Sequence, residues 1–224
     1  MGNQIVLTVL FLFGITFLLI FNELVYRRLG LKGEITRKFA HFTGTLSTIT
    51  FPYLFESHWY VLILAVVFFI ILFISRNRTY LKSIHDIDRE SLGSYLLPVS
   101  IYLTFLVADL MDNQFLFILP ILVLAICDPI AGIMGINLQQ YNHKIRIFNW
   151  KLNKTWLGSL SFFISCLIIS IIALYFNQQN FTLKTFWLAL VVALVSTLTE
   201  MFSWRGTDNL VIPMSVLIVL LIML

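Results

Sequence analysis

Long apolar runs separated by short polar connections dominate the sequence. A helix needs about 20 apolar residues to cross the hydrocarbon core of a bilayer, and eight runs approach that length. The second run is short, at 17 residues, and several runs are interrupted by polar residues, so seven crossings are an alternative. The pattern predicts an all-α polytopic membrane helix bundle of about eight transmembrane helices, near residues 4–26, 39–55, 59–75, 93–111, 115–135, 157–176, 183–202 and 209–224.

Composition supports this interpretation. Of the 224 residues, 59% are hydrophobic and only 12% are charged, whereas a soluble domain has about 25% charged residues. Eight crossings leave no room for a separate soluble domain, so residues 1–224 are expected to form a single membrane-embedded domain. Cys127 and Cys166 both fall inside apolar runs. We expect them to be small core residues and not a disulfide or metal pair.

The basic residues predict the orientation of the bundle. Fourteen of the fifteen Lys and Arg residues lie in odd-numbered connections, and the exception is Lys184. The positive-inside rule makes that side cytoplasmic and places both termini outside. We therefore expect a multi-pass integral membrane protein, in the inner (plasma) membrane if the source is bacterial, with its active site facing the cytoplasm.

Two carboxylates inside apolar runs point to chemistry. Asp128 lies in the cytoplasmic half of the fifth run, and Glu200 lies near the inner end of the seventh. An ionisable group in the hydrocarbon region costs several kcal/mol and usually marks a functional site. Most other acidic residues also fall on the cytoplasmic side, so acids and bases converge at one membrane face.

The first polar group is Arg37, Lys38 and His41, where the first basic connection enters the second run. Spacings of three and four residues place them on one helical face. Such a face suits a phosphate held by two cations, with a histidine that orients a hydroxyl or relays a proton. The alternative is that the cations anchor the helix at the interface and that His41 is hydrogen-bonded in the core.

The second group surrounds Asp128, at the inner end of the fifth run. Pro129 is expected to break the helical hydrogen bonding there, and Gly132 and Gly135 allow a ligand or backbone to approach closely. Asp128 beside this break is a candidate Mg²⁺ ligand, because hard cations bound to phosphates take carboxylate oxygens. The alternative is a kinked helix with a paired aspartate.

Two further groups lie later in the chain. Lys154, Thr155 and Gly158 are expected to open the sixth helix, where N–H donors and a positive charge suit a phosphate. Asp208 and Asn209 follow Glu200 and precede the eighth run, where they suit a metal–phosphate complex. The alternatives are interface anchoring by Lys154 and capping of the eighth helix by Asp208.

A fifth group lies between the third and fourth runs and is expected to be a solvated charge cluster; it comprises Asp86, Asp88, Arg89, Glu90 and Gly93, and leads to Pro98.

Taken together, the groups resemble the family of CTP-dependent lipid-alcohol kinases, which includes dolichol kinase, phytol kinase and yeast-type diacylglycerol kinase. These kinases are distant relatives of the phosphatidate cytidylyltransferases. The matches to the family's motifs run in order from the second run to the eighth: Arg37, Lys38 and His41; Asp128, Ala131 and Gly135; Lys154, Thr155 and Gly158; and Glu200, Asp208, Asn209 and Pro213.

The chain departs from the family pattern at three places. Gln139 stands where a further glycine is expected. In the family's Lys-Lys-Thr-x-Glu-Gly box, which Lys154, Thr155 and Gly158 match, Asn153 and Leu157 replace the first Lys and the Glu. The interval from Asp128 to Lys154 is also longer than in the pattern. The altered box belongs to the nucleotide-binding part of the family's site.

The resemblance implies phosphoryl transfer, which depends mainly on positioning and charge neutralisation. It implies CTP as co-substrate, Mg²⁺ as cofactor, and a lipid alcohol such as a polyprenol, phytol or diacylglycerol as acceptor. The expected partners are these substrates and membrane lipids, with no nucleic acid; a homo-oligomer is left open. The expected metal ligands are Asp128 and Asp208; the expected catalytic residues are Asp128, Glu200 and His41; and the expected nucleotide contacts are Arg37, Lys38, Ala131, Gly132, Gly135, Lys154, Thr155, Gly158, Asp208 and Asn209.

Two alternatives differ in what they predict. A phosphatidate cytidylyltransferase would release pyrophosphate and form a CDP-lipid. A transporter would place its ionisable groups near the bilayer midplane and show repeat symmetry, and this sequence shows no clear repeat.

Overall fold

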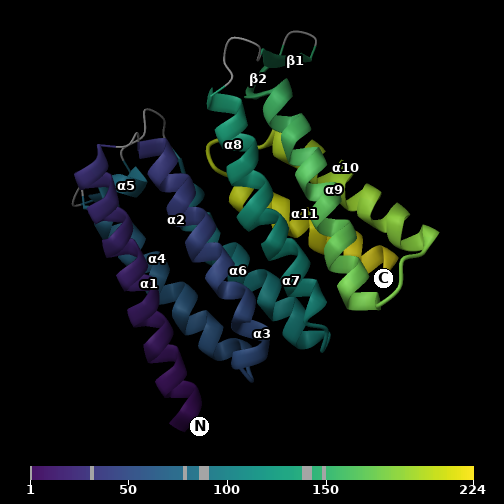
Figure 1. Ribbon diagram of the computed structural model, residues 1–224. Helices are drawn as coiled ribbons and strands as arrows, with labels where there is room; N and C mark the ends of the chain where they lie inside the picture. Colours follow the sequence, from purple (N-terminus) through teal and green to yellow (C-terminus); the bar gives the residue numbers. More distant parts are fainter. Residues whose placement is uncertain (1, 31–32, 78–79, 86–90, 138–142, 148–149) are drawn as a thin grey trace.

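The computed structural model describes residues 2–30, 33–77, 80–85, 91–137, 143–147 and 150–224, which form a bundle of helices with one short β-hairpin (Figure 1). The elements in chain order are α1 (Gly2–Leu29), α2 (Gly33–Ser47), a 3₁₀ turn (Thr48–Thr50), α3 (Phe51–Leu54), α4 (His58–Asn77), α5 (Lys82–His85), α6 (Gly93–Leu110), α7 (Phe115–Leu122), a π-helical turn (Val123–Cys127), α8 (Asp128–Asn137), β1 (Lys144–Ile147), β2 (Trp150–Thr155), α9 (Trp156–Gln178), α10 (Leu183–Phe202) and α11 (Asp208–Met223).

The multi-pass membrane character is confirmed. Within the described ranges, six helical segments are long and apolar enough to cross a bilayer: Gly2–Arg28, His58–Arg76, Gly93–Leu110, Phe115–Ile136, Trp156–Gln178 and Leu183–Phe202. The two other predicted runs form a helix interrupted by a 3₁₀ turn (33–54) and the shorter apolar helix α11. The count of eight crossings and the sides of the termini stay predictions.

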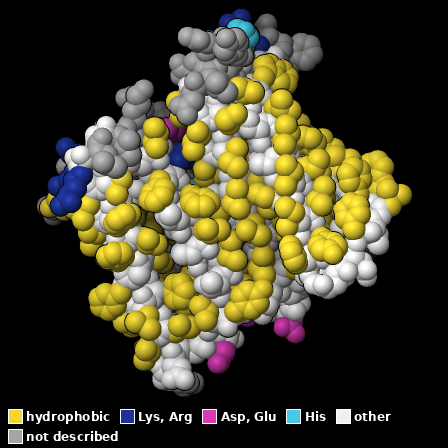
Figure 2. Space-filling view, in the orientation of Figure 1, with side chains coloured by type: hydrophobic (Ala, Val, Ile, Leu, Met, Phe, Trp, Pro, Cys, Tyr) yellow, Lys and Arg dark blue, Asp and Glu magenta, His cyan; other side chains and the backbone are white. Residues whose placement is uncertain are grey.

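Charge is distributed unevenly along the bundle axis. Figure 2 shows apolar side chains covering the long sides of the helices, with Lys and Arg gathered at the end that carries the hairpin and α5. We call this the basic end; the last turns of α1 and α4 reach it with Arg27, Arg28 and Arg76. The N-terminus lies at the opposite end (Figure 1).

Helix α2 begins earlier than predicted, at Gly33, so Arg37 and Lys38 lie inside the helix and not in a connection. The hydropathy pattern does not predict the first turns of α2, because their residues are polar. They are compatible with a helix because each charge has a protein partner: Arg37 pairs with Glu34 one turn away, and Lys38 is buried in the bundle.

The predicted disruption of helical hydrogen bonding at Pro129 takes the form of a π-helical turn within an otherwise continuous helix from 115 to 137. Proline has no N–H to donate to the preceding turn. A wider turn over Val123–Cys127 accommodates this loss without interrupting the helix, and such π turns often occur at functional sites.

The hairpin was not predicted. Lys154 and Thr155, predicted to open a helix, instead end β2, and α9 begins at Trp156 with Thr155 as its N-cap. The strands pair antiparallel, with polar and apolar residues alternating around the fully buried Ile145.

The core lies where the two halves of the chain meet. An aromatic cluster at its centre brings together Phe51, Phe105 and Phe117, the last two with ring centroids 5.4 Å apart. Cys127 and Cys166 are both free and fully buried, which confirms that they are core residues.

A tight contact joins the start of α6 to the connection before α11. The backbone N–H of Leu92 donates to the Arg205 carbonyl at 2.8 Å, and the Asn209 side chain donates to the Gly93 carbonyl at 2.7 Å. Gly206 lies between them with φ +87°, and a Cβ there would come within 2.5 Å of the Gly93 nitrogen. Only glycine fits this position without backbone movement.

We expect Gly206→Ala to lower the free energy of unfolding by about 1–3 kcal/mol, because overpacking against backbone is added to the strain of a positive φ. Gly30→Ala is the matched control, since Gly30 also has positive φ but has open space around its Cβ position. Denaturant unfolding in detergent measures both variants. Equal losses would show that the close contact at Gly93 contributes nothing.

Candidate active site

The most buried ion pair in the site joins α2 to the start of α8. Lys38 Nζ lies 2.6 Å from Asp128 Oδ2 and 3.4 Å from the Asp128 carbonyl oxygen. Lys38 is 6% exposed and Asp128 3% exposed. Gly132 makes this approach possible, because a Cβ there would lie 2.6 Å from Lys38 Cε. The predicted close approach at Gly132 is thus made by a lysine side chain.

His41 lies next to this pair and contacts the π-helical turn. Its Nε2 is 3.3 Å from the Leu124 carbonyl oxygen and 3.8 Å from Asp128 Oδ2. Because a carbonyl can only accept, Nε2 carries the hydrogen in this contact, which leaves Nδ1 as an acceptor in the neutral ring. In a π turn the Leu124 carbonyl would pair with residue 129, which is proline and has no N–H. The helix irregularity therefore provides the acceptor that orients His41.

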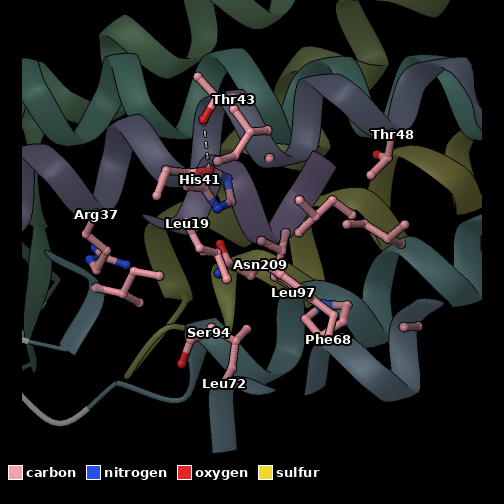
Figure 3. A pocket seen from close by; sticks show the side chains of 18 of the residues that line it. Leu19, Arg37, His41, Thr43, Thr48, Phe68, Leu72, Ser94, Leu97 and Asn209 are labelled. Carbon is pink, nitrogen blue, oxygen red and sulfur yellow. Dashed lines mark hydrogen bonds between the residues drawn. The ribbon is translucent and has the colours of Figure 1, made fainter. Parts of the chain in front are cut away.

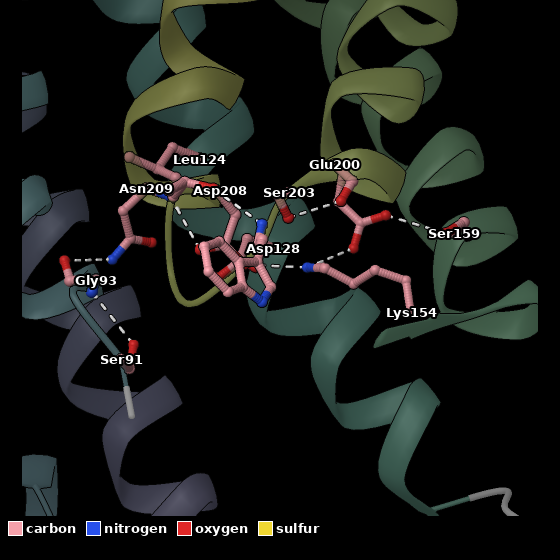
Figure 4. A network of polar contacts seen from close by, with 12 residues as sticks. Ser91, Gly93, Leu124, Asp128, Lys154, Ser159, Glu200, Ser203, Asp208 and Asn209 are labelled. Atoms are coloured by element: carbon pink, nitrogen blue, oxygen red, sulfur yellow. Dashed lines mark hydrogen bonds and ion pairs between the residues drawn. The ribbon is translucent and has the colours of Figure 1, made fainter. Parts of the chain in front are cut away.

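A second buried cluster is centred on Lys154 of β2 (Figure 4). Its Nζ lies 2.8 Å from Glu200 Oε1 and 3.0 Å from Asp208 Oδ2. Burial opposes the lysine's charge, but the carboxylates of Asp208 and Glu200 outweigh this effect and hold the pKa of Lys154 above its ordinary value. The hairpin thus brings one ammonium group to the ends of α10 and α11.

The remaining oxygens of this cluster are also engaged. Ser159 Oγ donates to Glu200 Oε2 at 3.0 Å, so both Glu200 oxygens have partners. The backbone N–H of Asn209 donates to Asp208 Oδ1 at 3.1 Å. Asp208 is the first residue of α11, and the N-cap is Thr207, which makes no side-chain cap hydrogen bond. The capping alternative for Asp208 is therefore wrong, and its carboxylate pairs with Lys154.

The two clusters form one electrostatic unit, because Asp128 interacts with both Asp208 and Lys154. The ion pairs of the unit join two lysines to three carboxylates, and Arg37 also interacts with Asp128 and Asp208. Among the described residues, nothing donates to Asp128 Oδ1. No group of three or more metal-ligating side chains occurs within the described ranges. Asp128 Oδ1 fits a cation that phosphate oxygens also bind, which is the usual arrangement for Mg²⁺.

A cavity of about 650 Å³ lies beside this unit, between α1, α2, α4 and α6 (Figure 3). His41 and Asn209 line it and also belong to the polar site. Toward the basic end its wall is polar and includes Arg37. Away from that end it is lined by apolar side chains, among them Phe51, Leu64, Phe68, Leu97 and Ile101.

The glycines of the predicted nucleotide motifs bring α8 and α9 together. A Cβ at Gly158 would lie 3.1 Å from the Ala131 carbonyl, and one at Gly135 would lie 3.1 Å from Thr155 Oγ1. Thr155 is the N-cap of α9 and accepts from the Gly158 N–H at 3.2 Å. These contacts give the four residues a packing and capping role in this structure; their contact with a nucleotide stays a prediction.

Structure thus gathers most of the predicted site residues but divides the first group. Lys38 points to Asp128, whereas Arg37 points to the cavity and makes a bidentate pair with Glu34 at 2.8 and 2.9 Å. Ser159 and the Leu124 carbonyl were not predicted; no local sequence signal identifies a backbone acceptor of this kind. Asp86, Asp88, Arg89 and Glu90 lie outside the described residues.

Comparison with known proteins gives two matches. A family model described as the cytidylyltransferase family matches residues 1–203. A phytol kinase from Synechocystis sp. is 28% identical over 199 residues, which cover 86% of this chain and 80% of that protein. No solved structure matches significantly.

We expect Lys38→Met to lower the free energy of unfolding by about 3–5 kcal/mol, because it leaves Asp128 buried without a counter-charge. Adding Asp128→Leu should recover most of this loss, since replacing both partners by apolar residues is often neutral. Unfolding in detergent measures the cycle. Arg27→Met, which removes a partner of Glu23 at an exposed position, is the control and should cost less than about 1 kcal/mol. Simple additivity of the two core substitutions would contradict the pairing.

Proposed function

The chain belongs to the cytidylyltransferase family, and from this premise we propose that it is a membrane-embedded kinase that transfers the γ-phosphoryl group of CTP to a lipid alcohol. One observation carries the proposal. A cavity with an apolar interior lies beside a buried cluster of lysines and carboxylates, and His41 and Asn209 line the cavity and also contact that cluster. The similarity to a phytol kinase supports the same reaction class.

The cavity supports a lipid acceptor. Its volume, about 650 Å³, falls within the range of about 300–1,000 Å³ in which pockets enclose one drug-sized ligand. An apolar chain would lie among Phe51, Leu64 and Ile101, with its hydroxyl at the level of His41. A single chain of the phytol type fits this space better than the two chains of a diacylglycerol or a long polyprenol.

The ion cluster supports a polyphosphate donor. Lys38 and Lys154 are the ammonium groups that would neutralise phosphate oxygens, and both are held by carboxylates in this structure. Asp128 and Asp208 would hold Mg²⁺ together with those phosphates. When bound, Mg²⁺ would offset the negative charge that develops during phosphoryl transfer.

His41 is the better candidate for the group that accepts the hydroxyl proton. Its Nε2–H points to the Leu124 carbonyl, so Nδ1 is the basic atom, and the residue lines the cavity. Glu200 does not line the cavity, and both of its oxygens are engaged. In the proposed reaction the alcohol oxygen bonds to the γ-phosphorus, the bond to the β-phosphate bridging oxygen breaks, CDP leaves, and the hydroxyl proton passes to His41.

A cytidylyltransferase reaction is the second candidate, favoured by the description of the matching family. It would form a CDP-lipid from phosphatidate and release pyrophosphate. The two reactions differ in both products, so one assay separates them.

The test incubates purified protein with Mg²⁺, labelled CTP or ATP, and a panel of single-chain and two-chain lipid alcohols and phosphatidate. We expect lipid phosphate from CTP and a single-chain alcohol. Asp128→Asn should lower the rate by at least about 10²-fold, because it removes a charge from the phosphate site, while the thermal unfolding midpoint confirms folding. Wild-type turnover by this variant would remove the metal assignment, and no transfer across the panel would refute the kinase.

Gly44→Leu tests the acceptor cavity. Gly44 lines the cavity, and nothing lies within 4 Å of its Cβ position, so the new side chain should fill acceptor space without a clash. We expect KM for the lipid alcohol to rise about tenfold, equivalent to about 1.4 kcal/mol, while nucleotide affinity stays within twofold. Leu46→Phe, which enlarges an exposed side chain on the same helix, should change neither. An unchanged KM in Gly44→Leu would exclude this cavity as the acceptor site.

A further inference from the structure

The mouth of the cavity, at the basic end, is lined by cations from three separate elements. Arg37 lies in the second turn of α2, Arg76 in the last turn of α4, and Lys82 at the start of α5. All three line the cavity. In the sequence, Arg76 and Lys82 were only part of the basic connections that set orientation, a role that does not require them to line a cavity.

Arg37 is paired with the carboxylate of Glu34, but Glu34 does not line the cavity. Among the described residues, the lining contains no Asp or Glu, whereas the hydroxyl-bearing residues Tyr26, Tyr80, Ser91 and Ser94 line the same space. Cations and hydroxyl donors together suit an anion with several acceptor oxygens. The mouth is therefore chemically distinct from the cluster of Lys38 and Lys154, in which carboxylates outnumber lysines.

Arg76 is held in place by the protein. Its Nη1 donates to the Ser91 carbonyl at 2.8 Å, and its guanidinium lies 5.6 Å from the centroid of the Tyr95 ring. Arg37 is held by its bidentate pair with Glu34. Two of the three cations are thus pre-positioned, which lowers the entropy cost of binding an anion between them.

We propose that the cavity and its mouth together form a binding site for a single-chain lipid phosphate. The chain lies among the apolar residues between α1, α2, α4 and α6, and the phosphate is bound by Arg37, Arg76 and Lys82. A lipid phosphate is the product of the proposed reaction, so this inference rests on that function where it concerns turnover. Because the lipid phosphate occupies the same apolar cavity as the alcohol, the reaction product competes with the alcohol. The product is retained by the cations at the mouth, which the alcohol does not contact.

Three kinds of ligand carry a phosphate that suits the mouth, and the experiment distinguishes them: a lipid phosphate, a nucleotide, and the headgroup of a bulk anionic lipid. The probes are hexadecyl phosphate, hexadecanol, CTP and phosphatidylglycerol, each measured for binding to the purified full-length protein in neutral detergent by native mass spectrometry. None of these measurements requires turnover, so an inactive enzyme would refute the proposed function without deciding this inference.

We expect hexadecyl phosphate to bind more tightly than hexadecanol and phosphatidylglycerol. Lys82→Gln should lower the affinity for hexadecyl phosphate about tenfold, as expected for loss of one charge-assisted contact. The affinities for hexadecanol and CTP should stay within twofold of the wild-type values. Lys82→Arg should retain most of the affinity. Lys144→Gln removes the same charge from the hairpin, away from the cavity lining, and should change nothing.

Three results would overturn the inference. The first is equal affinity of wild-type protein for hexadecyl phosphate and hexadecanol. The second is a loss of CTP affinity in Lys82→Gln, which would make the mouth part of the nucleotide site. The third is an equal loss in Lys82→Gln and Lys144→Gln, which would indicate only the general attraction of basic residues for anionic lipid. If the kinase is active, inhibition by hexadecyl phosphate should also be competitive with the alcohol and weaker in Lys82→Gln.

Discussion

Buried charge is the constraint on which the rest of the structure depends. Asp128, Glu200 and Asp208 are each less than 10% exposed, and unpaired carboxylates in such surroundings would cost several kcal/mol each. Lys38 on α2 and Lys154 on β2 provide the counter-charges. Pairing these groups fixes α2 against α8 and positions the hairpin over the ends of α10 and α11. The elements between them are then held at the spacing that leaves the cavity beside His41.

The same constraint explains the irregular backbone. Pro129 and the π turn before it leave the Leu124 carbonyl without its helical partner, and His41 contacts that carbonyl. Gly132 gives Lys38 room to reach Asp128, and Gly206 lets the connection before α11 pack against Gly93. The π turn, Gly132 and Gly206 therefore lie at contacts between the polar site and its supports, and the π turn provides the acceptor for a histidine that lines the cavity.

The geometry divides the basic residues into two sets with different surroundings. The lysines of the buried cluster face an excess of carboxylates, which suits a polyphosphate that arrives with a divalent cation. The cations at the cavity mouth face hydroxyl-bearing residues and, within the described part of the chain, no carboxylate on the lining. In the proposed function, the first set would bind the donor phosphates and the second the phosphate of a lipid product.

Sequence alone determined the membrane bundle, the core cysteines and most of the polar residues that gather at the site, because hydropathy and embedded charges act locally and leave a direct pattern. It missed the polar first turns of α2, the hairpin and the π turn, because the contacts that Lys38, Lys154 and the Leu124 carbonyl make there join residues distant in sequence. Tertiary structure alone decided that Lys38 pairs with Asp128 across 90 positions and that Arg37 turns away to the cavity. It also decided that Arg76 and Lys82 line the same cavity as His41. Those relations depend on how helices pack, and no spacing within one segment encodes them.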